Sequence, residues 1–159
     1  MMIVGVVGIK NSGKTFFSQK LIEYYTSIKL KVASIKHAHH DFDIDKPGTD
    51  SFLHRKSGST EIIVSSSKRW AKIVELQNKD EKNLNELIKE LDNPDIVIVE
   101  GFKNESHPKI VIIKDGSKDL LFKKLINVKA IVSDEYIDTK IPQFKKNDIE
   151  KIAKFLINK

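Results

Sequence analysis

The sequence predicts a three-layer α/β sandwich built around a mostly parallel central sheet. Short apolar runs alternate along the chain with segments whose apolar residues recur at helical spacing, as in proteins with a layer of helices on each face of a sheet. Several runs are apolar throughout, which is typical of strands buried on both faces. Because such sheets bind ligands at the carboxyl ends of their strands, we expect functional residues directly after these runs.

The first part of the chain predicts a strand, a helix and a second strand in succession. Residues 2–7 form a nearly continuous apolar run, and residues 14–28 carry apolar side chains three and four positions apart. A second strand is expected over 31–35. The polar stretch 36–48 ends in Pro47-Gly48, which favours a loop.

The rest of the chain continues the alternation. Apolar runs predict strands over 60–65, 70–76, 95–99, 109–113 and 127–132, and helical spacing predicts helices over 49–56, 81–91 and 148–157. The run 95–99 is the clearest buried strand in the sequence. Phe16, Phe17 and Trp70 fall at periodic positions, so we interpret these aromatic side chains as part of the core.

The composition favours one soluble domain spanning residues 1–159. This length suits a single compact domain, and 40% hydrophobic residues can fill one core. No apolar run approaches the roughly 18 residues needed to span a bilayer, so we expect no membrane partner. The N-terminus enters a strand pattern without a secretion signal, which predicts a cytoplasmic protein. The absence of cysteine excludes disulfides, thiolate metal sites and cysteine nucleophiles.

The net charge of +6 raises the question of a nucleic-acid partner. The lysines are spread from Lys20 to Lys159, and the chain has only two arginines, Arg55 and Arg69. A spread of this kind favours a solvated surface over a binding patch. We therefore expect no nucleic-acid partner, and steep salt dependence of binding to unrelated DNA would contradict that expectation.

The segment Gly8–Thr15 reads Gly-Ile-Lys-Asn-Ser-Gly-Lys-Thr and matches the P-loop pattern G-x-x-x-x-G-K-[ST] in full. It follows a predicted buried strand and begins a predicted helix, so its backbone N–H groups and the positive end of the helix can surround phosphates. Lys14 supplies charge to the β- and γ-phosphates, and the Thr15 hydroxyl can bind Mg²⁺. The expected phosphate-binding residues here are Gly8, Lys10, Asn11, Ser12, Gly13, Lys14 and Thr15.

Glu100 follows the buried run 95–99 in the manner of a Walker B carboxylate. We predict that Glu100 is the catalytic carboxylate, and that with Thr15 it serves the metal, either through a water ligand or by orienting an attacking water. Asp95 begins the same strand and should therefore face away from the phosphates. Gly101 can let a backbone N–H approach the γ-phosphate. The alternative for Glu100 is a solvated carboxylate at a strand end.

Residues 36–50 contain three histidines and four aspartates on the edge of the sheet where the P-loop is expected. Their spacing fits no closed structural zinc site, so we favour a loop that faces phosphates or substrate. Lys36 or His37 would lie near anionic groups, and the aspartates near magnesium or polar substrate atoms. The expected substrate or switch residues are Lys36, His37, His39, Asp43, Asp45 and Asp50. The alternative is a disordered polar loop.

Ser133-Asp134 follows the strand expected over 127–132. An aspartate there can accept hydrogen bonds from the edge of a guanine base, so Asp134 is a candidate base-binding residue. The usual guanine motif N-K-x-D is absent, and a turn-forming role is the alternative for Asp134.

Three motifs together resemble one family over nearly the whole chain. They are the P-loop Gly8–Thr15, the segment Ile35–Ser51 (Ile-Lys-His-Ala-His-His-Asp-Phe-Asp-Ile-Asp-Lys-Pro-Gly-Thr-Asp-Ser), and Val99-Glu100-Gly101-Phe102-Lys103 followed by Pro108-Lys109. In these residues the chain is similar to the molybdopterin-guanine dinucleotide biosynthesis protein B (MobB) family. One departure is Phe16, where the family commonly has a second threonine.

The resemblance implies a P-loop NTPase fold and a GTP-binding adaptor with weak Mg²⁺-dependent GTPase activity, commonly a homodimer. Such an adaptor assists the molybdopterin guanylyltransferase that attaches GMP to molybdopterin. In this family the loop rich in histidine and aspartate and the Glu-Gly-Phe-Lys turn would surround GTP and the pterin. A stand-alone small-molecule kinase is the alternative, since the same groups can position a γ-phosphate for transfer. Kinases usually close an arginine-rich lid over the phosphates, and two arginines fit that role less well.

Overall fold

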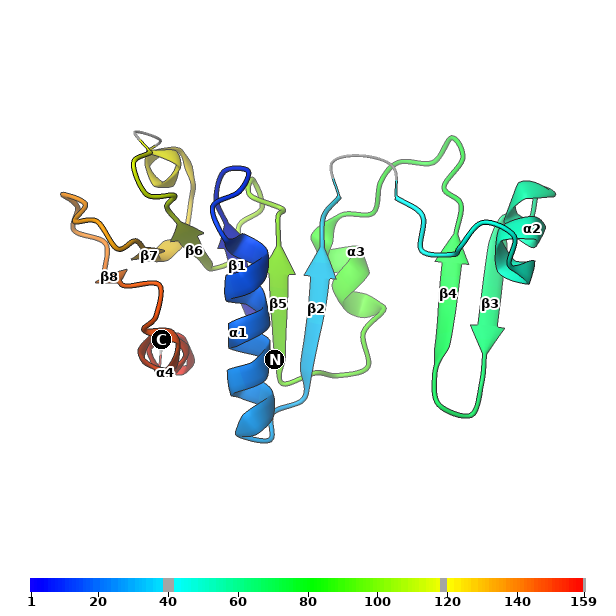
Figure 1. Cartoon of the computed structure of the whole chain (residues 1–159), viewed down its shortest axis with the longest axis horizontal. Coiled ribbons are helices and arrows are strands. Elements are labelled where there is room, and N and C mark those ends of the chain that lie inside the picture. The colour runs from blue at the N-terminus through cyan, green and yellow to red at the C-terminus, as the bar shows by residue number, and fades with distance from the viewer. Residues whose placement is uncertain (39–41, 118–119, 159) are drawn as a thin grey trace. The chain divides into compact units, whose positions relative to one another are not determined.

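The computed structural model describes residues 1–38, 42–117 and 120–158. The chain divides into two compact units, one formed by residues 1–37 with 84–159 and the other by residues 38–83. The larger unit contains the central sheet and the P-loop, and the smaller unit contains a short helix and a hairpin (Figure 1).

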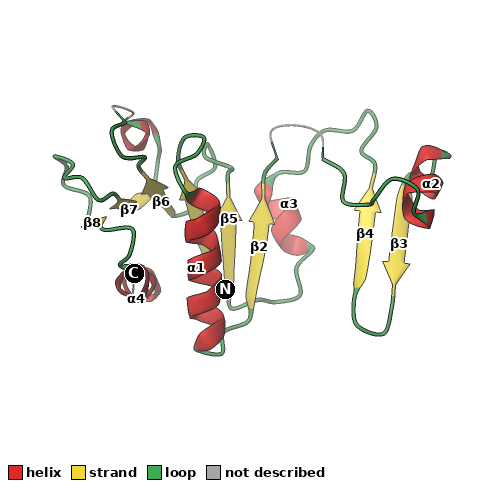
Figure 2. Ribbon diagram, viewed as in Figure 1, coloured by secondary structure: helices red, strands yellow, loops and turns green. Residues whose placement is uncertain are grey.

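A six-stranded sheet forms the centre of the larger unit, with strand order β2-β5-β1-β6-β7-β8 (Figure 1), and Figure 2 draws its strands in yellow. All of its strand pairs are parallel. The strands are β1 (Met2–Val7), β2 (Val32–Lys36), β5 (Ile96–Glu100), β6 (Lys109–Ile112), β7 (Val128–Val132) and β8 (Gln143–Phe144). The predicted α/β fold with a mostly parallel sheet, consistent with a P-loop NTPase, is therefore confirmed.

Helical layers cover both faces of this sheet. The elements are α1 (Lys14–Ser27), α4 (Ile149–Ile157), α3 (Leu84–Lys89) and the 3₁₀ helix η1 (Leu121–Lys124). Phe17 of α1 and Ile152 of α4 pack with Val4 on one face, whereas Leu84 of α3 packs with Val97 on the other. Residues 96–99 of β5 are buried throughout, because neither face of this strand meets solvent. The apolar run in the sequence is uninterrupted because every one of these side chains is buried.

The register of the strands brings three chain segments to one level at the carboxyl edge of the sheet. Lys36 at the end of β2 is paired with Glu100 at the end of β5, and Glu100 is paired with Val6 of β1. Since β1 ends at Val7, directly before Gly8, the P-loop begins beside these two charged side chains. Parallel pairing thus assembles the candidate site from strands that are distant in sequence.

A buried lysine fastens the connection between β5 and β6. The Lys109 side chain is fully buried, and its ammonium donates to the backbone carbonyls of Glu105, His107 (2.8 Å) and Ile126 (3.5 Å). Burial lowers the pKa of Lys109, whereas nearby Glu105 raises it. These hydrogen bonds hold the segment that follows Glu100 against the sheet.

The imidazole of His107 occupies the space above a glycine of β1. A Cβ atom at Gly5 would lie 2.4 Å from Nε2 of His107, so a side chain at this position would displace the ring. His107 is only 8% exposed, and within the described part of the chain neither ring nitrogen has a hydrogen-bond partner. Burial, with a smaller effect of Lys109, lowers its pKa from 6.5 to about 4. His107 is therefore neutral at physiological pH.

The smaller unit contains α2 (Asp50–Lys56) and an antiparallel hairpin of β3 (Glu61–Ser65) and β4 (Trp70–Val74). Arg55 forms ion pairs with Asp45 at 2.7 Å and Asp43 at 2.8 Å, and Glu75 lies 3.6 Å from it. The bond to Asp45 lowers the pKa of that carboxyl group. This charged cluster joins the segment before α2 to the helix itself.

The core interpretation of the aromatic side chains is correct for Phe17 and wrong for Phe16 and Trp70. Phe17 is buried, whereas Phe16 and Trp70 are 56% and 69% exposed. Adjacent residues of a helix point about 100° apart, so only one of two neighbouring phenylalanines can face the core. A two-stranded sheet cannot bury both of its faces, which leaves Trp70 exposed.

Most predicted elements appear within three residues of their expected ends, but two short elements were not predicted. The 3₁₀ helix η1 and the two-residue strand β8 are too short to produce a periodic pattern. Among the described residues, no helix has both the length and the apolar character required of a membrane span.

Candidate nucleotide-binding site

The backbone of the P-loop curls into a tight loop that is closed by a hydrogen bond. Asn11 and Gly13 have positive φ angles of 60° and 92°, and the Lys14 ammonium donates to the Ile9 carbonyl at 2.7 Å across the loop. A Cβ atom at Gly8 would lie 2.5 Å from both the Ile112 carbonyl oxygen and Ser12 Oγ, so this position requires glycine. The loop therefore has the tight geometry that the motif predicts.

Two further features of the loop suit an anion. The first turn of α1 contains no acidic residue, so the positive end of the helix is not neutralised locally. Ser12 is buried, and its hydroxyl has no hydrogen-bond partner within the described residues. An orphaned hydroxyl beside free helix N–H groups fits a ligand that brings acceptor oxygens, as a phosphate does.

The structure brings together the two residues predicted to serve the metal. Thr15 Oγ1 donates to Glu100 Oε1 at 3.1 Å, and Lys36 Nζ lies 3.4 Å from the same oxygen. No cluster of three or more His, Asp or Glu side chains suited to a metal occurs in the described residues. A hydroxyl and one carboxylate match the few protein ligands that Mg²⁺ uses when phosphates supply the rest. These residues therefore fit a magnesium–nucleotide complex.

The charges of this site act on one another. Partial burial lowers the pKa of Lys14, Glu100 raises it, and Lys36 lowers it further. Two cations and one carboxylate thus share one electrostatic neighbourhood, and an arriving anion would relieve the repulsion between the lysines.

The turn after β5 is locked to the end of β2. Gly101 has a φ of 99°, and a Cβ atom there would lie 2.7 Å from the Cβ of His37. The His37 ring stacks on Phe102 with 4.6 Å between ring centroids, and His37 N–H donates to the Glu100 carbonyl at 2.9 Å. The Gly101 N–H donates to the Val6 carbonyl at 3.4 Å. His37 therefore contacts the Glu100 turn and supports it.

The other predicted loop residues belong to the smaller unit or lie outside the described residues. Asp43 and Asp45 pair with Arg55, and Asp50 is an exposed residue in the first turn of α2. His39 lies outside the described residues. Arg55, one of the two arginines of the chain, is thus already engaged by carboxylates.

A third group of residues gathers where β6, β7 and β8 end. The Lys146 backbone N–H donates to Asp134 Oδ1 at 3.1 Å, and the Lys146 ammonium lies 2.6 Å from Asp115 and 3.7 Å from Asp134 Oδ2. The Gly116 N–H donates to Glu135 Oε1 at 2.9 Å. Asp134 is half-exposed, so its carboxylate is held in place yet retains acceptor capacity toward solvent. Sequence reasoning identified Asp134 but not Lys146, whose partners depend on the unpredicted strand β8.

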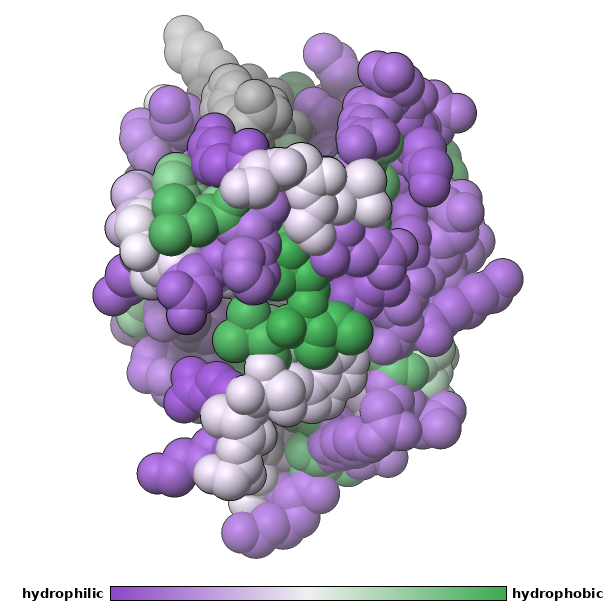
Figure 3. Space-filling model, turned by 90° about the vertical axis from the view of Figure 1, so that its right-hand side faces the viewer, coloured by the Kyte–Doolittle hydropathy of each residue, from purple (hydrophilic) through white to green (hydrophobic). Residues whose placement is uncertain are grey.

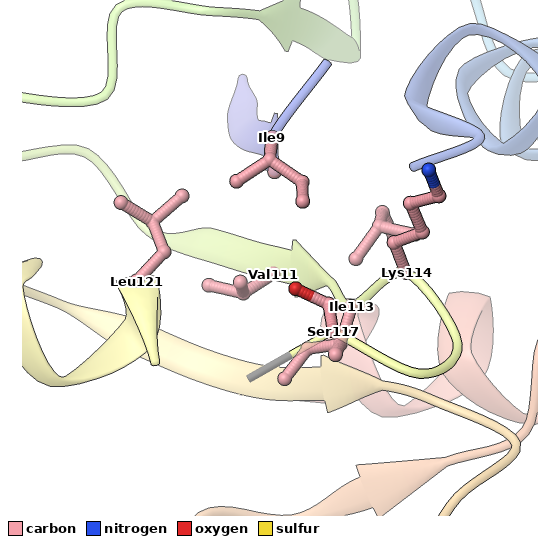
Figure 4. A pocket seen from close by; sticks show the side chains of 8 residues that line it. Ile9, Val111, Ile113, Lys114, Ser117 and Leu121 are labelled. Atoms are coloured by element: carbon pink, nitrogen blue, oxygen red, sulfur yellow. The ribbon is translucent and has the colours of Figure 1, made fainter. Parts of the chain in front are cut away.

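A small cavity lies beside the P-loop, where Gly8 and Ile9 meet the end of β6 and Leu121 of η1. Its lining is largely apolar, and Ile9, Val111, Ile113 and Leu121 surround it, with Lys114 and Ser117 nearby (Figure 4). The space around it, about 190 Å³ with the adjoining solvent included, is below the usual size of a ligand pocket. It is therefore too small to hold a nucleotide, which fits better along the carboxyl edge of the sheet.

Comparison with known proteins places the chain in one family. Residues 3–134 match the family model described as molybdopterin guanine dinucleotide synthesis protein B (MobB). The chain is 36% identical over 152 residues to the molybdopterin-guanine dinucleotide biosynthesis adapter protein of Escherichia coli, covering 92% of this chain and 86% of that one. It is 32% identical over 158 residues to the adapter protein of Haemophilus influenzae, covering 98% and 88%.

Solved structures agree with these relatives. A crystal structure of molybdopterin-guanine biosynthesis protein B superimposes with a TM-score of 0.81 at 25% identity and covers 99% of both chains. A structure of Bacillus subtilis MobB gives a TM-score of 0.75 at 25% identity and covers 98% of this chain and 97% of that one. The chain belongs to the MobB family of molybdopterin guanine dinucleotide synthesis proteins.

Proposed function

We propose that the chain is a GTP-binding adaptor that assists a molybdopterin guanylyltransferase in attaching GMP to molybdopterin in the cytoplasm. The observation that carries this proposal is the P-loop with Thr15 hydrogen-bonded to Glu100, in a chain whose relatives are named adapter proteins of this pathway. Weak hydrolysis of GTP is part of the proposal, because a positioned carboxylate lies beside the expected metal site.

Each residue of the proposed site has a distinct role in binding the nucleotide and the metal. The backbone of Gly8–Thr15 would surround the phosphates, Lys14 would bridge the β- and γ-oxygens, and the Thr15 hydroxyl and Glu100 would hold the metal. Bound Mg²⁺ would neutralise charge on the phosphate oxygens. Glu100 would orient the attacking water, either directly or through a water ligand of the metal.

The adaptor role is tested by a coupled assay of molybdopterin guanylylation with and without this chain. We expect the chain to stimulate the guanylyltransferase in the presence of GTP and Mg²⁺. An unchanged rate would contradict the adaptor proposal. Transfer of the γ-phosphate to a small molecule would instead identify a kinase.

We also propose that the adaptor acts as a homodimer. The hairpin of the smaller unit exposes apolar side chains at Ile63, Val64, Trp70 and Val74. Figure 3 shows apolar side chains gathered among polar ones on the face that it presents. Exposed apolar groups of this kind favour association with a partner surface.

Glu100→Gln should preserve GTP binding and slow GTP hydrolysis by about 100-fold, because an amide cannot accept a proton from water. The measurement is phosphate release at saturating GTP, together with calorimetric titration of GTP binding. Glu23→Gln is the matched control, since Glu23 lies on α1 and pairs with Lys20. An unchanged hydrolysis rate in Glu100→Gln would remove the catalytic role of this carboxylate.

Asp134 is proposed to read guanine. Its carboxylate can accept hydrogen bonds from the N1–H and the exocyclic amino group of the base, while the Lys146 N–H keeps it oriented. Asp134→Asn should lower GTP affinity by about tenfold or more and leave ATP affinity unchanged, as charge-assisted hydrogen bonds are lost. Asp115→Asn is the matched control, because Asp115 also pairs with Lys146. Equal affinities of the unsubstituted chain for GTP and ATP in calorimetry would contradict guanine selectivity.

A further inference from the structure

Lys36 occupies a position beside the P-loop that the proposed binding of GTP does not yet explain. It is the last residue of β2 and lies opposite Glu100 in the parallel register, two strands from the strand that leads into the P-loop. Its side chain reaches Glu100, the carboxylate that accepts a hydrogen bond from Thr15. Lys36 is therefore a cation on the metal side of the expected phosphate site.

The ion pair between Lys36 and Glu100 is poorly suited to a structural role. The Lys36 side chain is 64% exposed and its nitrogen lies 3.4 Å from the carboxylate, whereas Glu100 is only 15% exposed. Because the lysine remains largely in solvent, this ion pair contributes little to stability. The lysine can thus leave Glu100 without disturbing the fold.

The charge balance indicates what Lys36 would bind after leaving Glu100. Lys14 and Lys36 are both cations near Glu100, and one carboxylate cannot compensate both of them. If Glu100 and Thr15 bind a metal ion, Lys36 loses its carboxylate partner and is free to bind another anion. In a bound nucleoside triphosphate the γ-phosphate supplies that anion, and a diphosphate lacks it.

We propose that Lys36 binds a γ-phosphate oxygen of the nucleotide and so makes the protein distinguish a nucleoside triphosphate from a diphosphate. The inference rests on the proposed nucleotide site and adds a specificity-determining residue to it. Lys14 would serve both nucleotides, because it also contacts the β-phosphate. Lys36 would serve the triphosphate alone.

The test is calorimetric titration of the full chain with Mg²⁺ and either GDP or the non-hydrolysable analogue GMP-PNP. Lys36→Met should weaken GMP-PNP binding by about tenfold to a hundredfold and change GDP binding by less than about threefold, as expected for loss of one charged hydrogen bond. Lys36→Arg should retain the preference for the triphosphate. Lys151→Met on α4 is the matched control, since it removes the same charge from an exposed lysine paired with Asp148.

The outcomes separate this inference from the proposed function. If Lys36→Met weakens both nucleotides equally, or neither, Lys36 does not contact the γ-phosphate and the inference is wrong, while nucleotide binding by the chain stands. Absence of nucleotide binding in the unsubstituted chain would overturn the proposed function and this inference together. A thermal unfolding curve for each variant confirms that it is folded.

Discussion

Lys14→Ala is expected to abolish measurable GTP binding, with a loss of affinity of about 100-fold or more. The Lys14 ammonium is partly buried and held to the Ile9 carbonyl across the P-loop, so it lies where the phosphates would enter. Removing it deletes charged hydrogen bonds to two phosphates at once, each costing about 1.5–3 kcal/mol. The measurement is calorimetric titration with GTP and Mg²⁺.

Lys20→Ala is the control for this prediction, because Lys20 lies on the same helix and pairs with Glu23 on its exposed face. It should bind GTP as the unsubstituted chain does. Normal binding by a folded Lys14→Ala variant would show that the phosphates bind elsewhere, and the assignment of the P-loop would be wrong.

Stability is expected to fall by about 2 kcal/mol between about pH 7.5 and pH 5, and by about 3 kcal/mol on reaching pH 4, because of His107. In the folded chain burial lowers the pKa of His107 from 6.5 to about 4. The unfolded chain therefore binds a proton first as the pH falls. The stabilisation is present in full above pH 6.5 and is lost as the pH approaches 4.

Urea unfolding at several pH values measures this loss, and His107→Leu isolates it. The variant lacks the titrating ring, so its stability should change less over the same range. Carboxyl groups with lowered pKa values, such as Asp45 and Asp148, lose their contributions to stability mainly below about pH 4.5. The loss of stability between about pH 7.5 and pH 4.5 is therefore assigned to His107. Parallel pH profiles for the two proteins would contradict the assignment.

The parts of the site that sequence predicted are those whose residues are adjacent in the chain. Gly8–Thr15 could be recognised because one loop must supply both the curled backbone and the helix end that bind phosphate. Glu100 could be placed because a buried strand and the residue after it are read from a single apolar run. The conformation of each depends mainly on its own segment.

The contacts that sequence could not predict depend on the order of the strands. Lys36 meets Glu100 because β2 is paired with β5, an arrangement that neighbours in sequence do not reveal. Lys146 meets Asp115 and Asp134 through β8, a strand of two residues with no detectable periodicity. Lys109 begins the strand expected over 109–113, and only the carbonyl groups around its ammonium explain its burial.

The buried ammonium of Lys109 also affects how the chain meets reactive chemicals. Acylating reagents attack neutral amines that they can reach, and exposed lysines react through the small fraction of their amines that is deprotonated at any moment. Lys109 is fully enclosed and its ammonium is held by three carbonyl groups. A reagent can therefore acylate Lys109 only after β6 and the segment before it have opened. Acylation of this single side chain therefore records how often that part of the sheet comes apart.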